Sequence, residues 1–160
     1  MKNEPFPIPN NRVSNQWNIG VRIKVSDFKE ANKNALSLLE NGATALYFEL
    51  EKTPTHGELT DLLKGINLEW ISTNFKIHQP FWERTYSNFI KIIEEKGENP
   101  NEVQCSFQFE GNEISNVEQF KNKIPKLPKG QFLTIQSKYE KDPVSELSKT
   151  IFEANQVLIQ

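Results

Sequence analysis

Residues 17–25, WNIGVRIKV, alternate between apolar and other side chains without a break. Apolar side chains occupy the odd positions, and Arg22 and Lys24 are among the even ones. A period of two predicts a half-buried β-strand, with one face in a core and the other facing polar surroundings. A helix and a second strand are predicted next, which favours parallel pairing, and parallel strands are normally buried on both faces. The fold therefore depends on what lies against Arg22 and Lys24.

Composition limits the classes of protein that the chain can form. The 160 residues carry a formal net charge of -2, so no basic excess points to nucleic acid or to an anionic membrane. The one cysteine excludes an intramolecular disulfide and a multi-cysteine metal site, and it suits a reducing, cytoplasmic location. No signal peptide is recognisable, and no apolar run approaches the roughly 20 residues of a membrane-spanning helix. We expect an N-terminal arm over residues 1–15 and a single domain over 16–160.

Strand and helix patterns then alternate along the chain. Capping-box spacing, typical of a helix start, occurs at Asp27 with Glu30, and again at Thr55 with Glu58. Five strand and helix units in this order predict a parallel sheet with right-handed crossovers. The further strands are expected at 43–51, 69–77, 103–109 and 131–138, and the helices are expected to begin at Asp27, Thr55, Pro80, Ser115 and Pro143.

The polar positions of the strands decide between two architectures. A doubly wound sheet is covered by helices on both faces and has continuous apolar strands, whereas four of these five runs are polar at every second position. We therefore predict an α/β fold that is a partial (β/α) TIM-type barrel, with about five parallel strands, helices outside and a polar inner face. The outer face would carry Val21, Phe48, Phe75, Phe107 and Ile135. The inner face would carry Arg22, Lys24, Glu49, Ser72, Asn74, Gln104, Ser106, Gln108, Thr134 and Gln136.

Residues 16–50, QWNIGVRIKVSDFKEANKNALSLLENGATALYFEL, resemble the start of the substrate-domain barrel of methylmalonyl-CoA mutases. The resemblance is closer to their small, non-catalytic β subunit than to the catalytic chain. Residues 143–159, PVSELSKTIFEANQVLI, resemble the helix that follows a mid-barrel strand of that family, with Glu146-Leu147 as its marker. The matching positions in the first segment are Trp17, Ile19, Arg22, Asp27, Ala31, Asn32, Leu38, Leu39 and Asn41-Gly42-Ala43.

The resemblance implies a barrel belonging to an adenosylcobalamin-dependent isomerase that interconverts methylmalonyl-CoA and succinyl-CoA in propionate metabolism. In that family the catalytic chain passes the pantetheine arm of CoA through a barrel lined by small polar side chains. It also implies a partner, because the small subunit forms a heterodimer with a large catalytic chain. The chain covers about five of the eight βα units of a complete barrel.

Departures from the family pattern separate this chain from catalytic members. Where catalytic chains run from the first strand into Tyr-Ala-Gly-Phe, this chain continues as residues 21–24, VRIK. Residues 137–140, SKYE, lack the histidine of the tyrosine-histidine pair that ends the fifth strand of catalytic chains. The cobalamin-binding pattern Asp-x-His-x-x-Gly is absent around His56 and His78. We therefore predict no catalytic, cofactor-binding or metal-binding residue in this chain, with cobalamin held elsewhere in the implied complex.

The inner face offers two interpretations of its charges. Arg22 and Lys24 have the chemistry to bind a phosphate or a carboxylate. Internal pairing of Arg22 with Glu49 is the favoured alternative, because structural ion-pair networks are common. The candidate ligand-binding or pairing residues are Arg22, Lys24, Glu49, Asn74, Gln108 and Gln136.

The remaining reactive side chains favour structural roles. His56 and His78 lie at strand-to-helix junctions without a second ligand at metal spacing. Cys105 lies on the apolar side of its strand, where a buried, inert thiol is expected. Trp82, Tyr86 and Phe89 recur at the spacing of a helical packing stripe.

Three functions are consistent with these features of the sequence. The first is a small-subunit-like component of a methylmalonyl-CoA mutase that supports a large catalytic chain without binding cobalamin, as a heterodimer or a homo-oligomer. The alternative is a stand-alone domain whose polar face binds an anionic small molecule such as an acyl-CoA. An enzyme acting alone is least favoured, because the catalytic residues of the resembling family are missing.

Overall fold

A computed structural model describes residues 18–78, 82–110, 127–131 and 142–158. Its sheet has five parallel strands in the order β1-β2-β3-β4-β5, so the predicted α/β fold is confirmed. Four helices accompany the strands in the described residues. The elements are β1 Gly20–Val25, α1 Phe28–Glu40, β2 Ala45–Leu50, α2 His56–Leu62, β3 Ser72–His78, α3 Trp82–Lys96, β4 Gln104–Glu110, β5 Gly130–Gln131 and α5 Pro143–Leu158.

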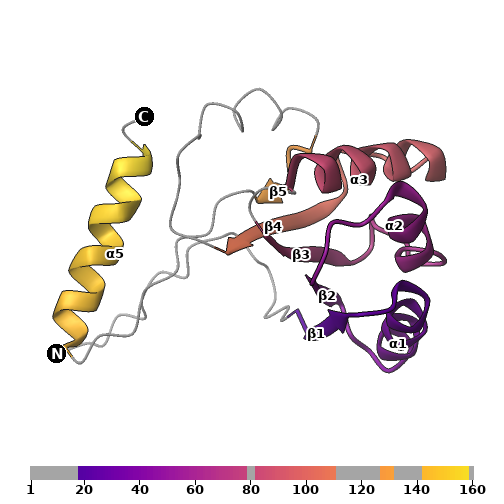
Figure 1. Cartoon of the computed structure of the whole chain (residues 1–160), viewed down its shortest axis with the longest axis horizontal. Helices are drawn as coiled ribbons and strands as arrows, with labels where there is room; N and C mark the ends of the chain where they lie inside the picture. The colour runs from indigo at the N-terminus through magenta and orange to yellow at the C-terminus, as the bar shows by residue number, and fades with distance from the viewer. Residues whose placement is uncertain (1–17, 79–81, 111–126, 132–141, 159–160) are drawn as a thin grey trace, which may run out of the picture.

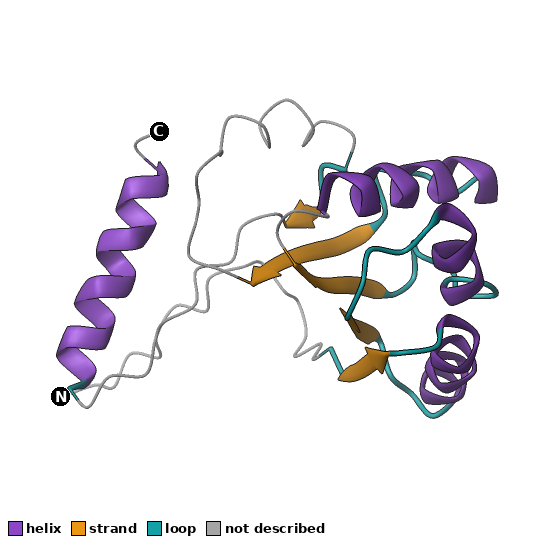
Figure 2. Ribbon diagram, viewed as in Figure 1, coloured by secondary structure: helices purple, strands orange, loops and turns teal. Residues whose placement is uncertain are grey.

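The helices α1, α2 and α3 cover one face of the sheet (Figures 1 and 2). Each follows a strand and leads to the neighbouring parallel strand, so the sheet is wound in a single direction. A doubly wound sheet would reverse its strand order and place helices on both faces. Strands in sequential order with helices on one face are the arrangement of a partial (β/α) barrel.

The predicted caps position the first two helices. The Asp27 carboxylate accepts a hydrogen bond from the backbone N–H of Glu30 at 2.8 Å. The helix α1 ends at Glu40, with Asn41 as its C-cap, and the next residue, Gly42, has a φ of 96°. At α2 the complete capping box is present, because the Thr55 hydroxyl accepts from the Glu58 N–H and the Glu58 carboxylate accepts from the Thr55 N–H. Both helix starts therefore follow from local hydrogen bonding.

The capping box predicts a stability that depends on pH. A hydrogen bond from Lys52, followed by those from Thr55, lowers the pKa of Glu58 from 4.5 to about 2. A depressed pKa stabilises the fold above the unfolded-state pKa, and this stabilisation is lost as the pH falls from 4.5 towards 2. Glu58→Gln is expected to cost about 1 kcal/mol at pH 7, because the site is near the surface. In chemical denaturation the two proteins should converge near pH 2; a constant difference would contradict this role.

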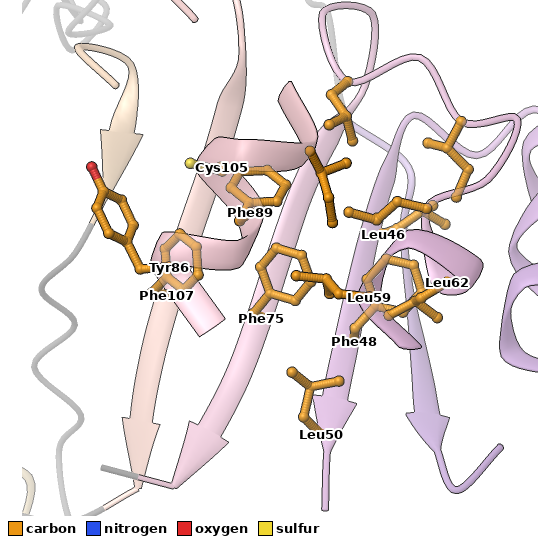
Figure 3. Close-up of a cluster of buried hydrophobic side chains, with 14 of the residues drawn as sticks. Leu46, Phe48, Leu50, Leu59, Leu62, Phe75, Tyr86, Phe89, Cys105 and Phe107 are labelled. Carbon is orange, nitrogen blue, oxygen red and sulfur yellow. The ribbon is translucent and has the colours of Figure 1, made fainter. Parts of the chain in front are cut away.

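The core lies between the sheet and the three helices. Phe75 of β3 stacks between Phe48 of β2 and Phe107 of β4, with ring centroids 5.9 Å and 5.3 Å away (Figure 3). The ring of Phe89 on α3 meets Phe75 edge-on at 5.2 Å. The predicted stripe of Trp82, Tyr86 and Phe89 on α3 is buried, and so are Ile90 and Ile93. The aromatic residues of this helix are therefore core residues.

Asn32 joins α1 to the end of α2. Its side-chain amide donates to the backbone carbonyls of Leu62 and Lys64, at 2.7 Å and 2.8 Å. Leu62 is the last residue of α2 and Lys64 follows its C-cap, so the Asn32 amide supplies donors to carbonyls at the point where the helix ladder ends. Asn32 itself is 8% exposed. A polar side chain on the buried side of α1 thus fixes how α2 ends against it.

Two boundaries differ from the predictions. The structure begins β1 at Gly20 and β3 at Ser72, so the assignment of Trp70 to the third strand is wrong. The backbone N–H of Glu69 donates to the Asn67 side chain at 3.0 Å, and the backbone N–H of Leu68 donates to the Glu98 side chain at 2.9 Å. These hydrogen bonds to side chains hold a turn in place of a strand. Trp70 is 82% exposed.

Several predictions fall outside the described residues. These are the arm at 1–15, the helix beginning at Ser115, and most of the fifth strand, with Thr134, Ile135 and Gln136.

Candidate functional site

Two rows of side chains cross the face of the sheet that lies opposite α1, α2 and α3. Strand register aligns the members of each row, and alternation directs them away from the buried apolar residues of the same strands. We call these two rows the polar face. The first row is Arg22, Tyr47, Asn74 and Ser106, and the second is Lys24, Glu49, Lys76 and Gln108.

Glu49 lies between two cations on this face. Its Oε1 is 3.5 Å from Nη1 of Arg22 on β1 and 3.8 Å from Nζ of Lys76 on β3. The Glu49 side chain is 18% exposed, against 73% for Arg22 and 42% for Lys76. The predicted pairing of Arg22 with Glu49 is therefore present, and the carboxylate is the sheltered member of the group.

Removing the carboxylate is expected to weaken the fold slightly. Glu49→Gln should lower the free energy of unfolding by about 0.5–1 kcal/mol, because ion pairs with well-exposed partners contribute little. Chemical denaturation at low and at high salt measures the effect, and screening should shrink it at 1 M salt. Unchanged stability at low salt would contradict the internal pairing.

Asn74 and Ser106 form a hydrogen-bonded pair in the middle of the face. The Ser106 hydroxyl donates to Oδ1 of Asn74 at 2.6 Å, and Nδ2 of Asn74 donates to the carbonyl of Leu46 at 3.2 Å. Both residues are 6% exposed, although no helix of the described part covers this face. Their polar groups are thus used within the sheet, and exposure rises towards β1.

Tyr47 belongs to the polar face, although the predicted inner set does not include it. Its ring lies over Gly20, where an added Cβ would come within 2.7 Å of Cε2. Gly20 therefore gives the ring space on the neighbouring strand. Tyr47 and Glu49 are two residues apart on β2, so strict alternation predicts that both point to the polar face. Lys76, which pairs with Glu49 across the strands, also lies on this face and is likewise absent from the predicted inner set.

The remaining candidate residues are spread over several parts of the fold. His56 is the first residue of α2, in the helical layer, with Nε2 3.1 Å from Oε2 of Glu95. Gln108 lies in the second row of the polar face. His78 is the last residue of β3, but its side chain is outside the described part of the chain, as is the whole of Gln136. Among the described residues, no three His, Cys, Asp or Glu side chains come together as a metal site. No described helix has the length and apolar character needed to cross a bilayer.

Cys105 faces the helices and is 3% exposed. Burial raises the pKa of its thiol to about 12. A thiol protonated at neutral pH is a poor nucleophile, so native Cys105 should react with an aromatic disulfide reagent at least about 100-fold more slowly than in denaturant. Absorbance of the released thiolate follows the reaction. Equal rates in the two conditions would show that the side chain is accessible.

Fold and site together define a class: a partial (β/α) barrel with a polar face held by internal hydrogen bonds and ion pairs. No protein-family model matches the chain. The chain is similar to the methylmalonyl-CoA mutase small subunit of Porphyromonas gingivalis (strain ATCC BAA-308 / W83), with 32% identity over 101 residues. These residues are 62% of this chain and 16% of that subunit, so the chain spans a small part of its relative. The similarity supports the resemblance to this family as a distant and partial one.

Proposed function

We propose that this chain is a non-catalytic component of an adenosylcobalamin-dependent methylmalonyl-CoA mutase, an isomerase of the cytoplasm. In this role it supports a large catalytic chain, as a small subunit does in a heterodimer, and binds no cobalamin itself. Its contribution is physical: a partner that binds only the folded catalytic chain stabilises that chain by mass action.

The observation that carries the proposal is the 32% identity to a mutase small subunit. The polar face adds support, because its carboxylate and its buried amide are committed to neighbours within the sheet. Glu49 is paired with Arg22 and Lys76, and Asn74 with Ser106. Groups held in this way build a stable surface and leave few side chains for acid-base chemistry.

Co-purification from cells that contain the mutase tests the proposal. The tagged chain should retain a large mutase chain, identified by mass spectrometry, and the retained fraction should convert methylmalonyl-CoA to succinyl-CoA when adenosylcobalamin is added. The tag alone is the control. Recovery of the tagged chain without any mutase chain would overturn the proposal.

A second candidate function rests on the exposed end of the polar face. The Arg22 side chain is 73% exposed, Lys24 is exposed beside it, and Tyr47 is 37% exposed. This combination suits an anionic small molecule with an apolar part, such as an acyl-CoA.

Titration calorimetry of the isolated chain with methylmalonyl-CoA separates the second candidate from the first. Binding that Arg22→Gln or Lys24→Gln weakens at least tenfold would favour the second. Lys29→Gln is the matched control, since it removes one positive charge from α1, where Lys29 is 3.8 Å from Asp61. No heat of binding would exclude this candidate.

A further inference from the structure

Asn41 and Gly42 lie in the turn between α1 and β2. They form the one Asn-Gly pair of the sequence. Both residues are exposed, and a Cβ added at Gly42 would meet no other atom within 4 Å. The side-chain direction of Gly42 is therefore open to solvent, and neither residue has a role in the polar face.

An Asn-Gly pair can react with itself in water. When the backbone N–H of Gly42 loses its proton to hydroxide, the nitrogen can form a bond to Cγ of Asn41, and the bond from Cγ to Nδ2 breaks to release ammonia. The product is a succinimide ring, and the absence of a Cβ on Gly42 leaves room for the approach. Water then opens the ring at either carbonyl and leaves aspartate or isoaspartate in place of Asn41. The net reaction consumes one water and replaces a neutral amide by a carboxylate and ammonium.

Hydrogen bonds hold the folded pair away from the geometry of this reaction. The Gly42 N–H, whose proton must leave, donates to the carbonyl of Leu39 at 3.0 Å. Nδ2 of Asn41 donates to the carbonyl of Ser37 at 2.7 Å, which fixes the side chain. The ψ of Asn41 is 12°, and at this angle the nitrogen of Gly42 is turned away from Cβ of Asn41. Ring closure therefore requires rotation about ψ and the loss of both hydrogen bonds.

Local opening at the end of α1 releases both bonds. The turn is a Schellman motif, in which the Gly42 N–H bonds the carbonyl of Leu39 and the Ala43 N–H bonds that of Leu38 at 3.0 Å. Residues 40–42 are exposed, so few buried contacts are broken when the turn opens. Helix ends of this kind open at a free energy well below that of global unfolding.

We propose that Asn41 is a site of spontaneous covalent modification in the folded chain, where opening of this turn lets the succinimide form and leaves aspartate or isoaspartate. The turn sets the rate, because the reaction waits for the open state. This inference is independent of the proposed mutase partner.

Either product weakens the turn in which it forms. The new carboxylate lies beside Glu40 at the C-terminal end of α1, where the helix dipole disfavours anions and the last turn has no basic residue. The amide donor to Ser37 is lost as well. In isoaspartate the main chain also runs through Cβ and Cγ, which displaces the Gly42 and Ala43 donors of the Schellman motif.

Peptide mapping by mass spectrometry tests the site. The full chain is kept for several weeks in mildly alkaline buffer, either folded or in urea, and the converted fraction at each asparagine is followed. Asn41 should convert in both samples, and at least about tenfold faster in urea, where the turn is open. Asn34 is the internal control, because it is exposed on the same helix but is followed by Ala35, whose Cβ hinders the attack. It should convert several-fold more slowly than Asn41 in urea.

Three results would overturn the proposal. If Asn41 stayed unchanged in the folded chain, the fold would block the reaction. If it converted equally fast folded and in urea, the turn would not control the rate. If Asn34 converted as fast as Asn41, the Asn-Gly pair would have no special reactivity.

Hydrogen exchange tests the effect on the turn. The converted chain is isolated by anion exchange, since it carries an additional negative charge. The N–H groups of Gly42 and Ala43 should exchange at least about tenfold faster than in the fresh chain, whereas exchange in β3 should be unchanged. Asn41→Gln, aged in parallel and shown to be folded by circular dichroism, is the control, because its longer side chain closes a ring far more slowly. Equal exchange at Gly42 and Ala43 in converted and fresh chains would contradict the weakening.

Discussion

Replacing Phe75 with alanine is expected to lower the free energy of unfolding by about 3–5 kcal/mol. The ring is 1% exposed and meets three other aromatic rings, those of Phe48, Phe89 and Phe107. Truncation removes its burial and leaves a cavity that stacked neighbours on paired strands cannot readily fill. Since small domains are stable by about 5–15 kcal/mol, the loss is a large fraction of the total. Urea denaturation, followed by circular dichroism, measures it.

Phe75→Leu is the control for this prediction. It keeps most of the apolar volume and should cost about 1 kcal/mol. If both variants lost the same small amount, Phe75 would not be a central residue of the core, and the packing in Figure 3 would be contradicted.

Asn32→Asp is expected to destabilise the fold by about 3 kcal/mol at pH 7. The substitution removes the two amide donors that bond the carbonyls of Leu62 and Lys64. It also places a carboxylate against two carbonyl oxygens at a site that is 8% exposed. The deficit should shrink at acid pH, because a protonated carboxyl group can donate one of the two hydrogen bonds. Denaturation curves at pH 7 and pH 4 test both parts of the expectation.

Asn34→Asp provides the comparison for Asn32. Asn34 is an exposed residue of the same helix, so the same change of charge should alter stability by less than about 0.5 kcal/mol. Equal effects at the two positions would show that the loss of stability comes from the negative charge on α1 and not from the two lost hydrogen bonds.

The elements that the sequence predicts best are those determined by local chemistry. The capping box at Thr55 and the side-chain cap at Asp27 form where their spacing predicts a helix start, because each needs only residues within one helical turn. The strict alternation around Arg22 identifies the uncovered face, and the pairing with Glu49 follows from strand adjacency.

The features that escaped prediction depend on contacts between distant segments. The carboxylate of Glu98 accepts from the backbone N–H of Leu68, 30 residues away, and helps to keep Trp70 out of β3. Asn32 donates to carbonyls 30 and 32 residues further along the chain, and the hydrophobic periodicity of the sequence gives no signal for such contacts. The spacing of Val144, Leu147 and Ile151 predicts an apolar side of α5, but periodicity cannot say which surface packs against it.

Each strand of this sheet pairs with the strand that comes next in the chain. Closing such a contact requires a loop of a few tens of residues, so the entropy lost at each step is small and similar for all strands. Proteins built from nearby contacts fold faster than those that must join distant ends. During synthesis, β1 and β2 can pair around α1 while later strands are still being translated, and the sheet can grow outward from its amino-terminal edge.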